Sequence, residues 1–251
     1  MGFRNTYADA AYAAAYARLG FPGTYALAFR DLPGILAVHV ATGRALDFGC
    51  GTGRSTRFLR ECGFQVVGVD IAEVMIAEAR KLDPAGDYRL LSEGDLGPLG
   101  HEAFDLVLAA FTFDNIATMR RKAGLLSGLR GLLAPEGRIV MIVSSPDMYT
   151  NEWVSFSTRA FPENRRATSG EVVRIVNLAI ADPTPCEDVL WTDDAYRETF
   201  QRARLVSAGA YRPLARDDDP GQWVNETRIA PWVIYVLKAA RPARVRTAAK
   251  E

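Results

Sequence analysis

Residues 44–55 read Arg44-Ala45-Leu46-Asp47-Phe48-Gly49-Cys50-Gly51-Thr52-Gly53-Arg54-Ser55. The pattern is a short apolar strand that runs into a glycine-dense turn and then into a helix. Glycines are needed in such a turn because the backbone bends tightly and a ligand must approach atoms that a Cβ would shield. The helix that follows offers unpaired backbone N–H groups and the positive end of its dipole. These residues therefore predict a ligand-binding loop at the end of a strand.

The spacing of the glycines separates two classes of nucleotide-binding loop. The dinucleotide fingerprint needs G-x-G-x-x-G, whose third glycine allows close helix–strand packing near a pyrophosphate. Counted from Gly49 that third position is Arg54, and counted from Gly51 it is Thr56. Asp47 would also repel a pyrophosphate, whereas a carboxylate suits a ligand with an ammonium group and a sulfonium centre. The loop is therefore not predicted to bind a dinucleotide.

Around this loop, short apolar runs alternate with helical stretches, which indicates repeated βαβ units and a parallel sheet. Strands are expected at 45–48, 65–69, 88–91, 104–109 and 138–143, and helices at about 55–62, 72–81 and 118–132. Proline and glycine at 133–137 are expected to turn the chain into the last of these strands. A helix capped by Thr192 and two strands, at 205–211 and 231–237, complete a doubly wound α/β fold.

Two segments lie outside this alternation. Residues 1–43 are expected to form a helical lid, with one Tyr-bearing helix that is broken at 20–23 and a second helix that ends near Val40. Residues 144–191 are too long for an ordinary connection and predict a small substrate cap over the carboxyl edge of the sheet. The chain then divides into the lid, a core at 44–143, the cap, the last helix and strands at 192–240, and a flexible tail at 241–251.

The segment Asp47-Phe48-Gly49-Cys50-Gly51-Thr52-Gly53 has the form acidic-hydrophobic-G-x-G-x-G. With it the chain resembles the class I S-adenosylmethionine-dependent methyltransferase family, of the type that acts on small molecules. The resemblance covers residues 45–143 well and the final two strands more loosely. It implies a mostly parallel seven-stranded sheet whose last strand, at 231–237, is antiparallel, and it implies S-adenosylmethionine as the cofactor.

The same resemblance assigns cofactor contacts to the strand ends. Asp70 ends the second strand where the family has its ribose ligand, and a carboxylate can accept hydrogen bonds from both ribose hydroxyls. Asp95, in Glu93-Gly94-Asp95-Leu96, matches the aspartate that accepts from the adenine amino group. The implied cofactor residues of the core are Asp47, Gly49, Cys50, Gly51, Gly53, Asp70, Ile71, Met75, Asp95, Leu96, Ala110 and Phe111.

The N-terminal segment adds a lid to this set. In related enzymes an N-terminal tyrosine and a downstream arginine close over the cofactor, and the arginine pairs with its carboxylate. By that resemblance Arg30 is expected to bind the carboxylate, with Tyr7 or Tyr16 as the lid. The alternative is that these tyrosines pack against the domain.

The substrate side carries weaker signals. Methyl transfer from a sulfonium is an in-line displacement that needs alignment and dehydration, so a dedicated base is not required. Asp114 follows the fourth strand and is the best acidic candidate for a catalytic group, with a helix cap as the alternative. Substrate contacts are expected from Tyr12, Asn115, Trp153 and Trp191. Trp153 and Trp191 could instead form the core of the cap, and Tyr12 could pack against the domain. His39 and His101 are expected to have surface or packing roles.

Composition limits the partners. Thirty Lys and Arg residues balance thirty Asp and Glu residues, which leaves no field to steer the chain onto nucleic acid or an acidic membrane. Three cysteines form no C-x-x-C pair, and two histidines cannot build a multi-histidine metal centre. We expect a cytoplasmic monomer or homodimer that takes a small-molecule substrate, without nucleic acid, membrane or metal.

The sequence thus predicts an enzyme that moves the methyl group of S-adenosylmethionine to a nitrogen or oxygen atom of a small molecule. The family pattern for exocyclic amines of bases or glutamine, Asn-Pro-Pro-Tyr, is replaced here by Thr112-Phe113-Asp114-Asn115. Two alternatives stay open. One is a protein or RNA methyltransferase, and the other is a non-catalytic partner subunit that binds S-adenosylmethionine.

Overall fold

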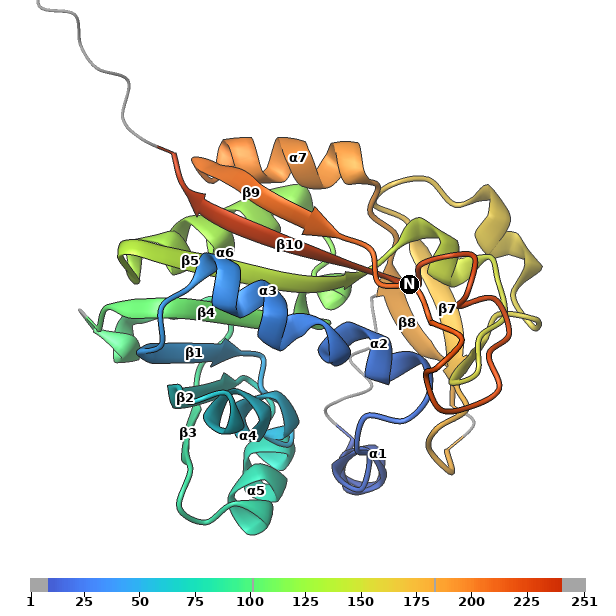
Figure 1. Cartoon of the computed structure of the whole chain (residues 1–251), viewed down its shortest axis with the longest axis horizontal. Coiled ribbons are helices and arrows are strands. Elements are labelled where there is room, and N and C mark those ends of the chain that lie inside the picture. Colours follow the sequence, from blue (N-terminus) through green and yellow to red (C-terminus); the bar gives the residue numbers. More distant parts are fainter. Residues whose placement is uncertain (1–8, 101, 183, 241–251) are drawn as a thin grey trace, which may run out of the picture.

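The computed structural model describes residues 9–100, 102–182 and 184–240. Predictions for Tyr7, His101 and the tail 241–251 lie outside the described residues. The described chain is built around a seven-stranded sheet in the order β3-β2-β1-β4-β5-β10-β9 (Figure 1). Its strands are β1 (Arg44–Phe48), β2 (Gln65–Asp70), β3 (Asp87–Leu90), β4 (Phe104–Ala110), β5 (Leu133–Ser144), β9 (Leu205–Tyr211) and β10 (Trp232–Ala239). The predicted α/β fold is confirmed.

The strand directions match the expected pattern. Strands β1 to β5 pair with one another in parallel, and β10 runs antiparallel to both β5 and β9. Strand β5 begins earlier than predicted, because Leu133 already pairs with Phe104 before the register shifts and Leu106 pairs with Arg138. The expected turn at 133–137 is therefore wrong: an irregularity of the pairing accommodates Pro135 and Gly137 inside the strand.

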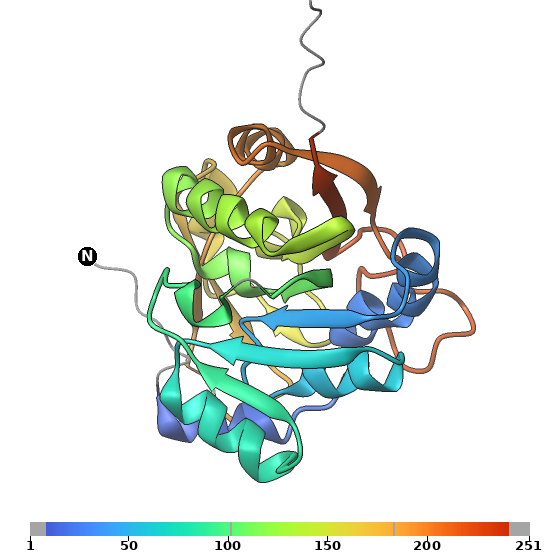
Figure 2. The same cartoon turned by 90° about the vertical axis from the view of Figure 1, so that its left-hand side faces the viewer.

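Helices cover both faces of the sheet. They are α1 (Ala10–Ala17), α2 (Thr24–Arg30), α3 (Leu32–His39), α4 (Arg54–Glu61), α5 (Glu73–Leu82), α6 (Met119–Gly131) and α7 (Asp193–Arg202). Because alternate strand residues point to opposite faces, Leu106 and Leu108 pack with α2, α3 and α4, whereas Val107 packs with α6 and α7. Figure 2 shows these helices on two sides of the sheet. The predicted break at 20–23 is present, but α2 directly after it was not predicted.

The segment 144–191 contains a second, smaller sheet. Strands β6 (Phe156–Ser157), β7 (Val172–Asn177) and β8 (Cys186–Val189) pair antiparallel in the order β6-β7-β8. Figure 1 shows β7 and β8 beyond the end of β5, on the side of the sheet where α1 and α2 also lie. The described helices include none that is both long and apolar enough to span a lipid bilayer.

A buried carboxylate joins β1 to α4. Asp47 is fully buried, and its Oδ2 accepts hydrogen bonds from Ser55 Oγ at 2.7 Å and from Thr56 Oγ1 at 2.6 Å. Burial raises the pKa of Asp47 to about 6, while the two hydroxyl donors act in the opposite direction. Both donors belong to the first turn of α4. Asp47 therefore fixes the start of this helix against the end of β1, and with it the shape of the glycine loop between them.

Candidate functional site

A cavity of about 960 Å³ opens at the carboxyl ends of β1, β2 and β4. Its walls come from the glycine loop after β1, from residues 69–72 and Met75 at β2, from 91–96 after β3 and from 110–112 and 115–117 after β4. The order of the strands reverses between β1 and β4, and doubly wound sheets bind ligands at such a point. The volume lies at the upper end of the range for small-molecule sites, so a nucleoside and a second small molecule can fit together.

The glycines of the loop differ in how much space surrounds them. Gly49 and Gly53 have positive φ of 76° and 78°, and a Cβ there would meet Thr112 and Tyr88 side chains at 2.3 Å and 2.5 Å. Gly51 also has a positive φ of 53°, yet a Cβ there would meet nothing within 4 Å. Gly49 and Gly51 line the cavity, whereas Gly53 does not. Gly51 is thus the position where the backbone stands open to a ligand.

Asp70 holds the loop from the neighbouring strand. Its Oδ2 accepts the Gly51 N–H at 2.8 Å, and its Oδ1 accepts the Ala72 N–H at 2.9 Å. Burial raises the pKa of Asp70, and the backbone donors oppose this shift. The carboxylate also lines the cavity. Asp70 therefore both stabilises the turn and borders the space for the ligand.

The wall after β3 supplies a second carboxylate. Asp95 lines the cavity, and its Oδ1 accepts the Gly97 N–H at 2.8 Å. Apolar side chains of Ile71, Met75 and Leu96 line the same cavity. Helix α6 contributes further wall residues that the sequence did not predict, namely Arg121, Gly124, Leu125 and Gly128. This part of the cavity therefore fits a flat apolar group that lies beside the carboxylate acceptor of Asp95.

Arg54 is a buried arginine of the cavity lining that sequence reasoning also missed. It directly follows Gly53, lies at the start of α4, and is only 8% exposed. Its guanidinium donates to Gly20 O at 2.5 Å and to Tyr16 Oη at 3.0 Å, and it lies 4.8 Å from the centre of the Tyr25 ring. Because Arg54 and Tyr16 both line the cavity, the pair offers a positive, donor-rich end to an anionic group.

Known proteins resemble this chain in sequence and in fold. Residues 46–141 match a family described as a methyltransferase domain. Trans-aconitate 2-methyltransferase from Acidovorax sp. (strain JS42) is 36% identical over 178 residues, which cover 70% of this chain and 57% of that protein. Ubiquinone biosynthesis O-methyltransferase from Bradyrhizobium diazoefficiens is 33% identical over 118 residues, 45% of this chain and 43% of that protein. The chain therefore spans just over half the length of the first relative.

Solved structures agree on the fold. The CcbJ methyltransferase from Streptomyces caelestis has a TM-score of 0.66 at 18% identity, over 94% of this chain and 98% of that one. DesVI from Streptomyces venezuelae has a TM-score of 0.65 at 18% identity, over 92% and 99%. The core of this chain is a class I S-adenosylmethionine-dependent methyltransferase domain. The predicted family is thus confirmed, and S-adenosylmethionine is the cofactor of that family.

Most cofactor residues expected for the methyltransferase domain surround one space. The cavity is lined by Tyr16, Gly49, Cys50, Gly51, Asp70, Ile71, Met75, Asp95, Leu96, Ala110 and Phe111. Gly53 and Asp47 do not belong to this lining. Asp47 is fully buried and does not line the cavity, and its Oδ1 accepts no hydrogen bond from the described residues. The expectation of a direct ligand contact for these two residues is therefore wrong, and their part is to shape the loop.

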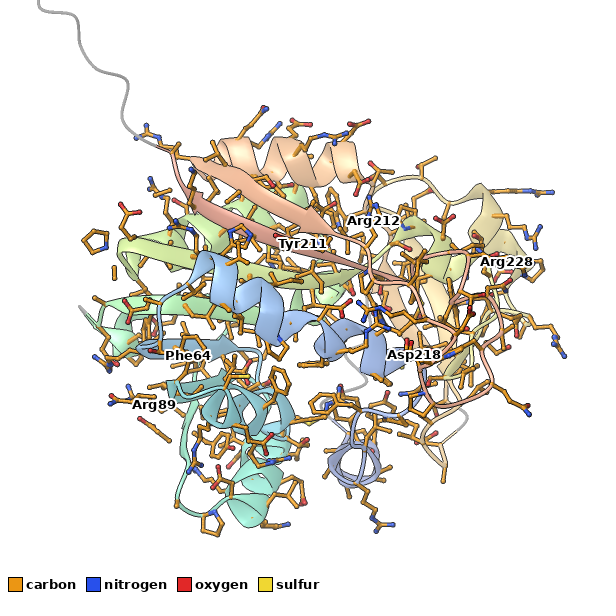
Figure 3. All side chains as sticks on the ribbon, viewed as in Figure 1. Phe64, Arg89, Tyr211, Arg212, Asp218 and Arg228 are labelled. Carbon is orange, nitrogen blue, oxygen red and sulfur yellow. The ribbon has the colours of Figure 1, made fainter. Side chains whose placement is uncertain are left out.

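The expectation for Arg30 is also wrong. Arg30 does not line the cavity, because its guanidinium is engaged by the carboxylates of Asp31 and Asp219 and by the backbone oxygen of Leu214. Figure 3 shows the loop that carries Asp218, the neighbour of Asp219, beside α2. In the methyltransferase domain the only arginine that combines cavity lining with a tyrosine hydroxyl partner, among the described residues, is Arg54.

Three expected substrate residues belong to the core instead. Tyr12 is 1% exposed and its hydroxyl lies 3.1 Å from Cys186 Sγ, while the Trp153 indole donates to Met148 O at 2.9 Å. Trp191 packs in the core beneath the sheet, with the Lys122 ammonium 4.8 Å from its ring centre. None of the three lines the cavity. Their size makes burial favourable, and the structure places all three in the core, with Trp191 in the main core beside α6 and α7 instead of a core of the cap.

Asn115 and Asp114 lie at a second, smaller space. A hollow of about 30 Å³ shares Tyr16, Phe111 and Asn115 with the cavity and also has Asp114 in its wall. The segment 144–191 contributes further residues, including Asn177 and Asp188. Asp114 is 4% exposed, and its Oδ2 accepts Ser144 N–H at 3.0 Å and Ser144 Oγ–H at 2.9 Å. Asp188 was not predicted, since no local pattern links β8 to the ends of β4 and β5.

Replacement of the two arginines separates their roles. We expect Arg54→Ala to weaken the affinity for S-adenosylhomocysteine about tenfold or more, because hydrogen bonds to a charged group contribute roughly 1.5–3 kcal/mol. Arg30→Ala removes an equal charge outside the cavity and should leave the affinity unchanged. Isothermal titration calorimetry on the two variants and the unaltered chain measures both. Loss of affinity in Arg30→Ala alone would reinstate the original assignment.

Proposed function

We propose that this chain transfers the methyl group of S-adenosylmethionine to a nitrogen or oxygen atom of a small molecule. The observation that supports this most directly is that the cavity and the hollow share the walls Phe111 and Asn115. A cofactor in the cavity and an acceptor group in the hollow would then meet at these residues. The segment 144–191 would act as the cap that keeps water from the meeting point.

The residues present fit the cofactor. In the proposed arrangement Asp70 accepts from the ribose hydroxyls and Asp95 accepts from the adenine amino group. The open Gly51 and the strand end at Ala110 border the methionine part, and Arg54 with Tyr16 binds its carboxylate. When bound, S-adenosylmethionine supplies an electrophilic methyl group on a sulfonium centre. The protein contributes alignment and exclusion of water, which an in-line displacement needs most.

Asp114 is the proposed proton acceptor. The two hydrogen bonds from Ser144 fix its Oδ2, and Asp114 lines the hollow. Burial raises the pKa of Asp114, and the ammonium of Lys122 acts against this shift. A carboxylate that is fixed by two donors and borders the hollow can take a proton from an acceptor group there.

The small size of the hollow favours a small acceptor over a macromolecule. Part of its lining consists of Met148, Phe156 and Ile175, which are buried side chains of the segment 144–191. A protein or an RNA would need an open surface at this point. The printed names of two relatives, a trans-aconitate methyltransferase and a ubiquinone biosynthesis methyltransferase, also refer to small molecules. A non-catalytic subunit would have no use for a hollow that adjoins the cofactor.

Transfer of a labelled methyl group tests this function. Incubation with methyl-labelled S-adenosylmethionine should label a small-metabolite extract and leave protein and RNA extracts unlabelled. Chromatographic separation of the three fractions followed by counting measures the result. Label in the protein or RNA fraction alone would favour a macromolecular acceptor, and cofactor binding without any transfer would favour the non-catalytic alternative.

Removal of the proposed proton acceptor should slow the reaction without loosening the cofactor. We expect Asp114→Asn to lower kcat about 100-fold, since a positioned base contributes roughly 10²–10⁴. In the unaltered chain the rate should rise with pH as Asp114 ionises, through a range above that of an ordinary carboxyl group. Groups that influence this range are Lys122 on α6, Asp188 on β8, Tyr149 beside β5 and Tyr196 on α7.

A pH–rate profile together with calorimetry on S-adenosylhomocysteine checks this prediction. Asp147→Asn provides the control, because Asp147 is exposed and lies outside both spaces. An Asp114→Asn variant with unchanged kcat and an unchanged profile would remove Asp114 from the mechanism.

A further inference from the structure

We propose that the acceptor is an amine, which enters the hollow as an ammonium group and is methylated on nitrogen. This inference rests on the proposed function and narrows it to one class of substrate. Two independent features of the hollow support it, namely the charge of its lining and the arrangement of its aromatic rings.

The lining of the hollow is acidic. Asp114 and Asp188 both line it, and no Lys, Arg or His side chain does so in the described part of the chain. Lys122 offsets part of this negative charge from outside the lining, where its ammonium contacts the backbone oxygen of Phe113. A second cation brought by the substrate would complete the neutralisation of two buried carboxylates.

Asp188 and Asp114 accept hydrogen bonds from different donors. Asp188 Oδ2 accepts a hydrogen bond from the Tyr149 hydroxyl at 3.1 Å, and Asp114 Oδ2 accepts both donors of Ser144. The Tyr196 hydroxyl also lies beside Asp114 and favours its charged form, and Asp114 is only 4% exposed. Both carboxylates line the hollow and can accept further hydrogen bonds there, and an ammonium group offers three donors.

Aromatic rings form the other half of the lining. Tyr25 lies between Phe156 and Trp232, with ring centres 5.0 Å and 6.0 Å away, and Phe111 lies 4.7 Å from Trp232. All four rings line the hollow. Ring faces attract a desolvated ammonium, so these rings favour a cationic group in the hollow. The guanidinium of Arg54 lies over Tyr25 as well, but it lines the larger cavity and not the hollow.

The same features exclude a carboxylic acid at this point. A carboxylate in the hollow would face two carboxylates with no cation in the lining, and like charges in a dry space repel strongly. The printed name of the trans-aconitate relative refers to a substrate with carboxyl groups, so the two proteins would differ at the acceptor end. A neutral hydroxyl would be tolerated but would leave the charge of the lining unused.

Methyl transfer to the bound amine begins with a proton transfer. The bound ammonium gives one proton to Asp114, which frees the nitrogen lone pair. That pair forms the new N–C bond to the methyl group, while the electrons of the C–S bond leave with the sulfur, which becomes a neutral thioether. The product is a methylated ammonium, and the proton on Asp114 is released to water when the product departs. Asp188 takes no part in the proton transfer: burial and the neighbouring Asp114 raise its pKa to about 7, and a bound ammonium favours its charged form, which attracts the ammonium.

Selective blocking of amines tests the proposal. A small-metabolite extract is divided, and one half is treated with the N-hydroxysuccinimide ester of acetic acid, which acylates amines and leaves carboxylates intact. Both halves are incubated with the chain and methyl-labelled S-adenosylmethionine. We expect label only in the untreated half, in a product that binds a cation exchanger and keeps its label in mild alkali.

The contrary outcomes are distinct from one another. Label that mild alkali releases as methanol would reveal a methyl ester, and label that persists in the acylated half in a neutral product would reveal an ether. Either result overturns the amine while the methyltransferase function stands. No transfer in either half, with S-adenosylhomocysteine bound in calorimetry, would overturn the proposed function and the amine together.

Replacement of a lining residue tests the amine proposal a second time, through the KM for the substrate. Asp188→Asn keeps an oxygen acceptor for Tyr149 and removes one charge, so the KM for the labelled amine should rise about tenfold or more. Glu187→Gln makes the same exchange one residue away, at a side chain that lines neither space, and should leave KM unchanged. Affinity for S-adenosylhomocysteine should be equal in all three proteins. An unchanged KM in Asp188→Asn would remove Asp188 as the ammonium anchor.

Discussion

The hydrogen bond from the Gly51 N–H to Asp70 is the interaction on which the site depends. It ties the bend after β1 to the end of β2, so one carboxylate shapes the loop and faces the ligand. Asp47 acts from behind, because Ser55 and Thr56 anchor the first turn of α4 to it. A short glycine-rich bend has little rigidity of its own. Two carboxylates from neighbouring strands therefore supply the order that a preformed cofactor site needs.

The residues near this bend could be predicted from the sequence because they follow strands that end at one edge. Periodicity located the strands, and the carboxyl ends of parallel strands meet. Gly51, Asp70, Asp95 and Phe111 accordingly line one cavity. The start of β5 was misplaced, because Pro135 and Gly137 suggest a turn while strand pairing with Phe104 overrides that local preference.

Residues that act across segments could not be predicted in the same way. Arg30 and Arg54 have similar local settings near a helix end, and only tertiary packing decides that the first meets Asp219 while the second meets Tyr16. The hollow is a stronger case, since α2, β8 and β10 contribute Tyr25, Asp188 and Trp232 from distant parts of the chain. The net charge of the chain gives no sign of the hollow either. A chain with zero net charge holds a local excess of carboxylates where the acceptor is proposed to bind.

The central claim, that the open bend at Gly51 receives S-adenosylmethionine, is tested most directly by titrating S-adenosylhomocysteine into the unaltered chain, Gly51→Ala and Gly63→Ala. Both variants add a Cβ at a positive φ, with nothing within 4 Å at Gly51 and only the Thr42 methyl at 3.9 Å at Gly63, but Gly63 lies outside the cavity. We expect Gly51→Ala to weaken S-adenosylhomocysteine binding about tenfold, the effect of roughly 1–3 kcal/mol of overpacking, and Gly63→Ala to leave it intact. Equal affinity in all three proteins, or a preference for NAD in the unaltered chain, would contradict it.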